Sequence, residues 1–113
     1  MLRIYHNNRC SKSRETLELI QNSGQEVEVI EYLKQQPDST ELKDILRKLN
    51  MKPEQIVRKG EAVYKEQYAG KNFTDEEWIQ ILVDNPVLLE RPIIVKGNKA
   101  VIGRPPENVL TLL

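Results

Sequence analysis

The sequence has few of the residues that build disulfides, metal sites or charged binding surfaces. Its 113 residues include one cysteine, Cys10, and one histidine, His6. A single cysteine excludes an internal disulfide, and these two side chains alone make a poor metal site. The 17 basic and 17 acidic residues cancel, which argues against binding to nucleic acid or to a membrane surface.

Long apolar segments are also missing. No run approaches the roughly 20 apolar residues that span a bilayer, and no signal peptide is evident at the start of the chain. We therefore expect a cytoplasmic protein whose thiol is kept reduced. The length suits one compact core, so residues 1–113 are predicted to form a single domain, and we expect a monomer.

Hydrophobic spacing predicts a strand, a helix and a second strand in the first third of the chain. Residues 2–5 form a short apolar strand, which the polar residues 6–8 end. Apolar residues then recur at helical spacing from Ser11, and Gly24 is well placed to end this helix. Residues 26–33 alternate as a strand does, and the order indicates a right-handed parallel crossover.

The middle of the chain is predicted to be helical. Asp38 and Thr74 each precede an apolar periodic run and have a glutamate three residues later, which is typical of a helix N-terminus. Pro53 opens a short helix, and residues 61–68 form another. Asn85-Pro86 stops the last of these helices.

The end of the chain is predicted to be a hairpin and a helix. Residues 93–95 and 100–102, joined by a turn at 96–99, have the pattern of antiparallel strands. Pro105-Pro106 then starts a final short helix. The whole order predicts an α/β protein with a mixed sheet of about four strands. It matches the thioredoxin fold with a helical insertion between its βαβ and ββα halves.

Cys10 lies where the first strand runs into the first helix. The first turn of a helix has unpaired N–H groups and the positive end of the dipole, so a thiolate is stabilised there. Cysteine is also a common small core residue, but the basic neighbours Arg9 and Lys12 favour a reactive thiol. In sheets of this kind, ligands gather at the carboxyl ends of the parallel strands, where Cys10 would lie. Cys10 is therefore the candidate nucleophile.

Ser13 takes the place of the second thiol of a Cys-x-x-Cys pair. An external thiol must therefore resolve any adduct formed on Cys10. The Ser13 hydroxyl either donates a hydrogen bond to the thiolate or belongs to an ordinary first-turn serine. His6 either favours the thiolate when it is protonated or only hydrogen-bonds the loop backbone.

Three arginines stand beside turn signals in the second half of the chain, namely Arg58, Arg91 and Arg104. A guanidinium is a rigid fork of donors that suits tetrahedral oxyanions and neutralises charge during attack. Taken alone, each arginine is more typical of a solvated surface charge, and their convergence on one site is an expectation. A cysteine-phosphatase loop is excluded, because it needs an arginine where this chain has Thr16.

Several separated motifs occur together, and in the same order, in one known family. They are Tyr5-His6-Asn7 through Cys10, Ser13-Arg14, Thr16-Leu17, Arg58-Lys59, Arg91-Pro92-Ile93 and Gly103-Arg104-Pro105. On these motifs the chain resembles the glutaredoxin-coupled arsenate reductases over nearly its whole length. The likeness is closest to the short, arsenate reductase-like members.

The resemblance implies a thioredoxin-like arsenate reductase-family domain that takes part in arsenic detoxification. It implies Cys10 as nucleophile and arsenate, or a similar oxyanion, bound by Arg58, Arg91 and Arg104. His6, Asn7, Ser13 and Pro92 would be supporting residues, with a cis bond before Pro92. It also implies glutathione as co-substrate, glutaredoxin as partner and no bound cofactor.

Two other functions stay open on these residues. The first is a general glutathione-dependent thiol oxidoreductase, whose arginines would hold the carboxylates of glutathione. The second is a non-enzymatic regulator like the Spx-type transcription factors, which share this fold and bind RNA polymerase. Those regulators usually have a Cys-x-x-Cys switch, which Ser13 breaks here.

Overall fold

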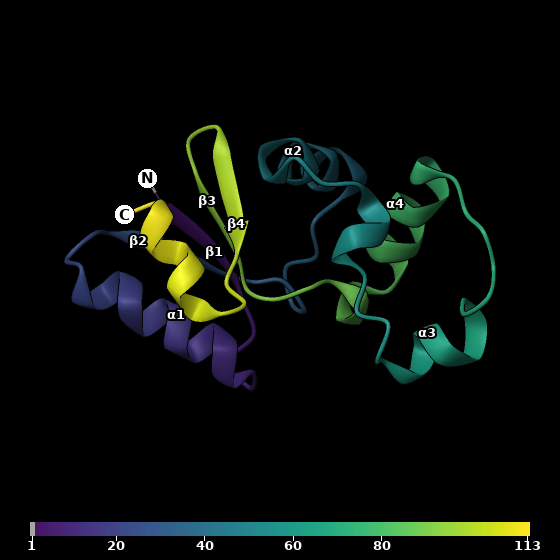
Figure 1. Ribbon diagram of the computed structural model, residues 1–113, viewed down its shortest axis with the longest axis horizontal. Coiled ribbons are helices and arrows are strands. Elements are labelled where there is room, and N and C mark those ends of the chain that lie inside the picture. The colour runs from purple at the N-terminus through teal and green to yellow at the C-terminus, as the bar shows by residue number, and fades with distance from the viewer. Residues whose placement is uncertain (1) are drawn as a thin grey trace. The chain divides into compact units, whose positions relative to one another are not determined.

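The computed structural model describes residues 2–113, which form two compact units (Figure 1). The sheet unit contains the residues up to Gln35 together with Arg91–Leu113, and the helical unit contains Gln36–Glu90. The sheet unit contains the predicted strands, and the helical unit contains the helices predicted for the middle of the chain. The prediction of a single domain for residues 1–113 stays a prediction.

A four-stranded mixed sheet organises the sheet unit. Its strands are β1 (Leu2–His6), β2 (Val27–Glu31), β3 (Ile93–Lys96) and β4 (Lys99–Ile102), in the spatial order β2-β1-β3-β4. β1 pairs with β2 in parallel and with β3 antiparallel, and β3 pairs antiparallel with β4. The predicted parallel crossover and the predicted hairpin are both confirmed.

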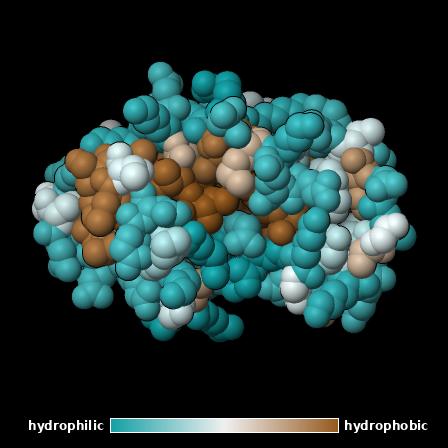
Figure 2. Space-filling model, in the orientation of Figure 1, coloured by the Kyte–Doolittle hydropathy of each residue, from teal (hydrophilic) through white to brown (hydrophobic). Residues whose placement is uncertain are grey.

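One face of this sheet packs against helix α1 (Ser11–Asn22) and the 3₁₀ helix η3 (Pro106–Thr111). The buried side chains of this core come from both strands and helices, and they are Leu2, Ile4, Ile20, Ile94, Val109 and Leu112. Leu110 of η3 is 54% exposed, and Figure 2 shows apolar surface over the region of η3 and the hairpin. The core therefore fixes α1, and with it the carboxyl end of β1, against the sheet.

Helix α1 begins and ends as its residues predict. Its last turn is followed by Gly24 at φ 77°, a left-handed conformation that glycine adopts without steric cost. The hairpin turn uses Gly97 in the same region, at φ 61°. The final helix, η3, is a 3₁₀ helix that begins at Pro106.

The helical unit contains α2 (Ser39–Leu49), η1 (Pro53–Ile56), α3 (Ala62–Gln67), α4 (Asp75–Asp84) and η2 (Pro86–Leu88). Asp38 caps α2, because its Oδ1 accepts the N–H of Glu41 at 2.8 Å. Thr74 and Glu77 form the predicted reciprocal capping box of α4, at 3.2 and 2.9 Å. Helix η2 follows Asn85 and was not predicted, since the sequence indicated only that α4 stops there.

Candidate functional site

Cys10 is the N-cap residue of α1 and follows β1 after a three-residue loop. Its backbone is extended, at φ −94° and ψ 123°, and its carbonyl accepts the first helical hydrogen bond from Arg14 at 3.0 Å. Its own N–H donates to the carbonyl of Asn7, also at 3.0 Å. The predicted position of the thiol at a strand-to-helix junction is therefore confirmed.

Side chains on both sides of the loop hold its shape. Oδ1 of Asn7 accepts the N–H of Arg9 at 3.0 Å, which folds the loop into an Asx turn. Nη1 of Arg14 donates to the carbonyl of Asn8 at 2.9 Å. The loop before Cys10 is thus tied to the first turns of α1 by main-chain and side-chain hydrogen bonds.

The hydroxyl of Ser13 lies inside this loop and is fully buried. It accepts the N–H of Asn7 at 3.0 Å and is 2.6 Å from Nδ1 of His6, which is 7% exposed. Its hydrogen-bond partners are thus His6 and Asn7, whereas the sequence had suggested the thiolate as one possible partner. Ser13 acts on the sulfur through its backbone N–H instead.

Burial sets the charge of His6. It lowers the pKa of the imidazole, and the charge of Arg14 lowers it further, while Glu31 opposes this; the net pKa lies below the ordinary value. A neutral ring at neutral pH suits the hydrogen bond to Ser13. The sequence had suggested either a protonated ring beside the thiolate or a hydrogen bond to the loop backbone, whereas the ring pairs with the Ser13 hydroxyl, which in turn accepts the N–H of Asn7.

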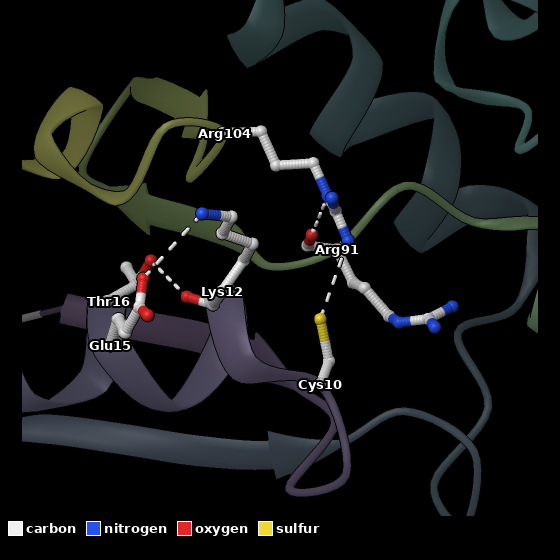
Figure 3. Close-up of polar contacts among 6 residues, drawn as sticks. All are labelled: Cys10, Lys12, Glu15, Thr16, Arg91 and Arg104. Carbon is white, nitrogen blue, oxygen red and sulfur yellow. Dashed lines mark hydrogen bonds and ion pairs between the residues drawn. The ribbon is translucent and has the colours of Figure 1, made fainter.

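Arg104 reaches the sulfur of Cys10 from the loop that follows β4 (Figure 3). Its Nη2 donates to Sγ at 3.4 Å, and its Nε donates to the main-chain carbonyl of Arg91 at 2.7 Å. One guanidinium therefore joins two segments of the sheet unit to the first turn of α1. Among the sequence-predicted arginines, Arg91 and Arg104 are brought to Cys10.

The surroundings of Cys10 favour its thiolate. Burial raises the pKa of the thiol, which is 8% exposed, but the backbone N–H of Ser13, the guanidinium of Arg91 and the backbone N–H of Lys12 lower it. The net pKa lies below the ordinary value of a cysteine. The sulfur therefore lies beside the first backbone N–H groups of α1, at the positive end of the helix dipole.

Arg91 is half-buried in the segment that precedes β3 and keeps its charge. Burial lowers the pKa of its guanidinium, but Tyr32 and the Cys10 sulfur raise it, and the net pKa is raised. Tyr32, which is 1% exposed, was missed as a site residue. Its position just beyond β2, at the same edge as the cysteine loop, is the signal that could have found it.

Two predicted site residues remain, Pro92 and Arg58, and they belong to different units. The Arg91–Pro92 bond is cis, as the resemblance implied, and Arg104–Pro105 is a second cis bond that was not predicted. Arg58 belongs to the helical unit, where its Nε donates to Oε1 of Glu61 at 3.2 Å. Its place in an oxyanion site stays a prediction.

The arrangement in the sheet unit combines a nucleophile with cationic donors. A thiolate can attack an electrophilic centre, while the guanidinium groups of Arg91 and Arg104 bind the oxygens of an anion and neutralise its charge. In residues 2–113, no group of three or more His, Cys, Asp or Glu side chains could hold a metal ion. Within the same part of the chain, no helix is long and apolar enough to cross a membrane.

Comparisons with known proteins place the chain in a family. The model of the ArsC family matches residues 5–112. The chain is 48% identical to the uncharacterized protein YfgD of Escherichia coli K12, over 99% of this chain and 96% of that protein. It is 40% identical to an arsenate reductase of Neisseria meningitidis, over 99% of this chain and 97% of that protein.

A solved structure with the same fold is the arsenate reductase from Vibrio cholerae. It superposes with a TM-score of 0.95 at 41% identity, over 99% of this chain and 97% of that one. The likeness confirms the predicted thioredoxin-like α/β fold.

Proposed function

The chain belongs to the ArsC family, and on that premise we propose that it is an arsenate reductase whose nucleophile is Cys10. One observation carries the proposal: Nη2 of Arg104 lies 3.4 Å from Sγ of Cys10, whose thiol has a lowered pKa. A cation beside a thiolate stabilises the nucleophile and attracts the anion that it attacks. Arsenate is an anion of this kind.

In the first step, the Cys10 thiolate attacks the arsenic of arsenate. A sulfur–arsenic bond forms, and one arsenate oxygen leaves as water after it takes up protons. Arg91 and Arg104 bind the remaining oxygens and offset their charge, and we propose that Arg58 of the helical unit joins them. His6, Asn7 and Ser13 keep the loop in shape, and Pro92 supports the segment that begins with Arg91.

In the second step, the thiol of glutathione displaces another arsenic-bound oxygen as water, so that arsenic(V) bridges Cys10 and glutathione. A glutaredoxin thiolate then attacks the glutathione sulfur and forms a glutaredoxin–glutathione disulfide. The two electrons of the broken sulfur–arsenic bond reduce arsenic(V) to arsenic(III). Water releases arsenite and restores the Cys10 thiol.

One feature of the chain supports an external reductant. Cys10 is its only cysteine, so no second protein thiol can resolve the adduct. The chemistry needs no prosthetic group, because glutathione and glutaredoxin supply the electrons. Because these thiols stay reduced in the cytoplasm, we propose that the protein acts there. We also propose that it is a monomer.

The test is arsenite release from arsenate by the purified protein with glutathione and glutaredoxin. We expect release that depends on all three components and is abolished by Cys10→Ser. Arg58→Ala should raise the KM for arsenate if Arg58 completes the site. Cys10-dependent reduction of a glutathionylated peptide, with no arsenite above background, would instead identify a general thiol oxidoreductase.

A further inference from the structure

Gly103 occupies the tightest position among the glycines of the described chain. A Cβ placed on it would lie 2.6 Å from Oγ1 of Thr16 and 2.7 Å from Cγ of Pro92. Carbon atoms do not approach other heavy atoms this closely without displacement. Gly60 is the opposite case, because a Cβ there would meet nothing within 4 Å.

The need for glycine at this position comes from packing. The backbone of Gly103 lies outside the left-handed region that only glycine adopts readily, so an alanine can take its conformation. The absence of a side chain is what lets residue 103 approach α1 and Pro92. A methyl group must therefore push these segments apart.

The neighbours of Gly103 are held in place. Thr16 is fully buried, and its Oγ1 donates to the carbonyl of Lys12 at 2.7 Å, as Figure 3 shows within the first turns of α1. The N–H of Gly103 donates to the carbonyl of Pro92 at 2.9 Å. A shift of Thr16 would disturb its hydrogen bond within α1, the helix that begins after Cys10. A shift of Pro92 away from residue 103 would break the hydrogen bond between them.

The residue after Gly103 is the arginine that contacts the thiol. Nη2 of Arg104 is 3.4 Å from Sγ of Cys10, and its Nε holds the carbonyl of Arg91 at 2.7 Å. Gly103 therefore lies on the Arg104 segment itself, where that segment packs against Thr16 of α1 and against Pro92. A displacement of residue 103 moves Arg104 and the Arg91–Pro92 segment away from the sulfur together.

We propose that Gly103 is a positioning residue for this site: its missing side chain lets Arg104 and the Arg91–Pro92 segment close over Cys10. The expected effect on arsenate turnover rests on the proposed arsenate reduction, whereas the expected effect on the pKa of the Cys10 thiol does not. Gly103 has no side chain that could contact the sulfur, and it acts through the distance between α1 and the two arginine segments.

The experiment compares Gly103→Ala with the matched control Gly60→Ala, both as full chains with circular dichroism to establish folding. The pH midpoint of Cys10 alkylation by iodoacetamide is measured first, because a midpoint reports the thiol pKa independently of how accessible the sulfur is. We expect Gly103→Ala to have a higher midpoint and Gly60→Ala to match the unchanged protein. A Gly103→Ala midpoint equal to that of the control overturns the proposal.

Steady-state kinetics with arsenate give a second readout. We expect the KM for arsenate to rise at least roughly tenfold in Gly103→Ala, the lower end of the factor for one lost charged hydrogen bond, with a smaller change in kcat. If the unchanged protein does not reduce arsenate at all, the proposed function fails while the alkylation midpoints still decide the role of Gly103.

Removing the opposing side chain provides the compensating test. Gly103→Ala/Thr16→Ala should have a midpoint between those of Gly103→Ala and Thr16→Ala, because only the contact with Pro92 remains. If Gly103→Ala does not fold, the double variant is compared with Thr16→Ala alone. A higher midpoint in the double variant then supports the proposal, and equal midpoints overturn it.

Discussion

Nη2 of Arg104 donates a hydrogen bond to Sγ of Cys10, although the two residues are 94 positions apart in the chain. The same guanidinium is anchored through Nε to the carbonyl of Arg91 at 2.7 Å. This second hydrogen bond fixes the orientation of the Arg104 guanidinium. The position of Nη2 beside the sulfur therefore depends on the main chain at Arg91. A lysine has the charge but lacks this second, planar donor.

Arg104→Lys should therefore weaken arsenate binding although the charge is kept. We expect the KM for arsenate to rise roughly 10- to 100-fold, because one charged hydrogen bond contributes roughly 1.5–3 kcal/mol. The measurement is initial rates of arsenite formation at saturating glutathione and glutaredoxin. Arg47→Lys is the matched control, since Arg47 is an exposed residue of α2 whose side chain pairs with Asp44. Equal KM values for both variants would show that the fork at position 104 has no role.

Ser13→Ala should destabilise the fold around the cysteine loop. The buried hydroxyl accepts the N–H of Asn7 and pairs with Nδ1 of His6, so its removal leaves buried polar groups without a partner. We expect the free energy of unfolding to fall by about 1–3 kcal/mol in urea titrations. The exposed Ser39→Ala is the control and should change it by less than about 0.5 kcal/mol. A loss no larger than that of the control would contradict this role of the hydroxyl.

Local features of the site were predictable from the sequence. The junction at Cys10 follows from an apolar strand, three polar residues and a helical repeat that starts at Ser11. The hairpin follows from two β-branched runs around Gly97. In each case the signal lies within a few residues of the feature, so spacing and turn chemistry are sufficient.

The convergence of side chains was not predictable in the same way. Nothing near Arg104 in the sequence indicates that its guanidinium lies beside Cys10, because a surface arginine has the same local pattern. The role of Gly103 depends on how closely Thr16 and Pro92 pack, which no periodicity reports. Turn signals singled out the arginines, the family resemblance grouped them around one oxyanion, and the structure added Tyr32 beside Arg91.

His6 should make stability depend on pH. Its pKa is lowered in the folded protein, so the unfolded chain binds the proton first as the pH falls. The stabilisation is present above the unfolded value of about 6.5 and is lost as the pH falls through the lower folded value. We expect the free energy of unfolding to drop more for the unchanged protein than for His6→Gln between about pH 7.5 and 5. Parallel pH curves would show that His6 is not held neutral by burial.

The central claim, that Cys10 is an activated thiolate, is tested most directly by the pH dependence of its alkylation. Cys10 is the chain's only cysteine, so iodoacetamide reports on it alone. The lowered pKa predicts a midpoint below the ordinary thiol value of roughly 8.5, and a higher midpoint in Arg91→Ala. A midpoint at or above roughly 8.5, unchanged in Arg91→Ala, would contradict the account.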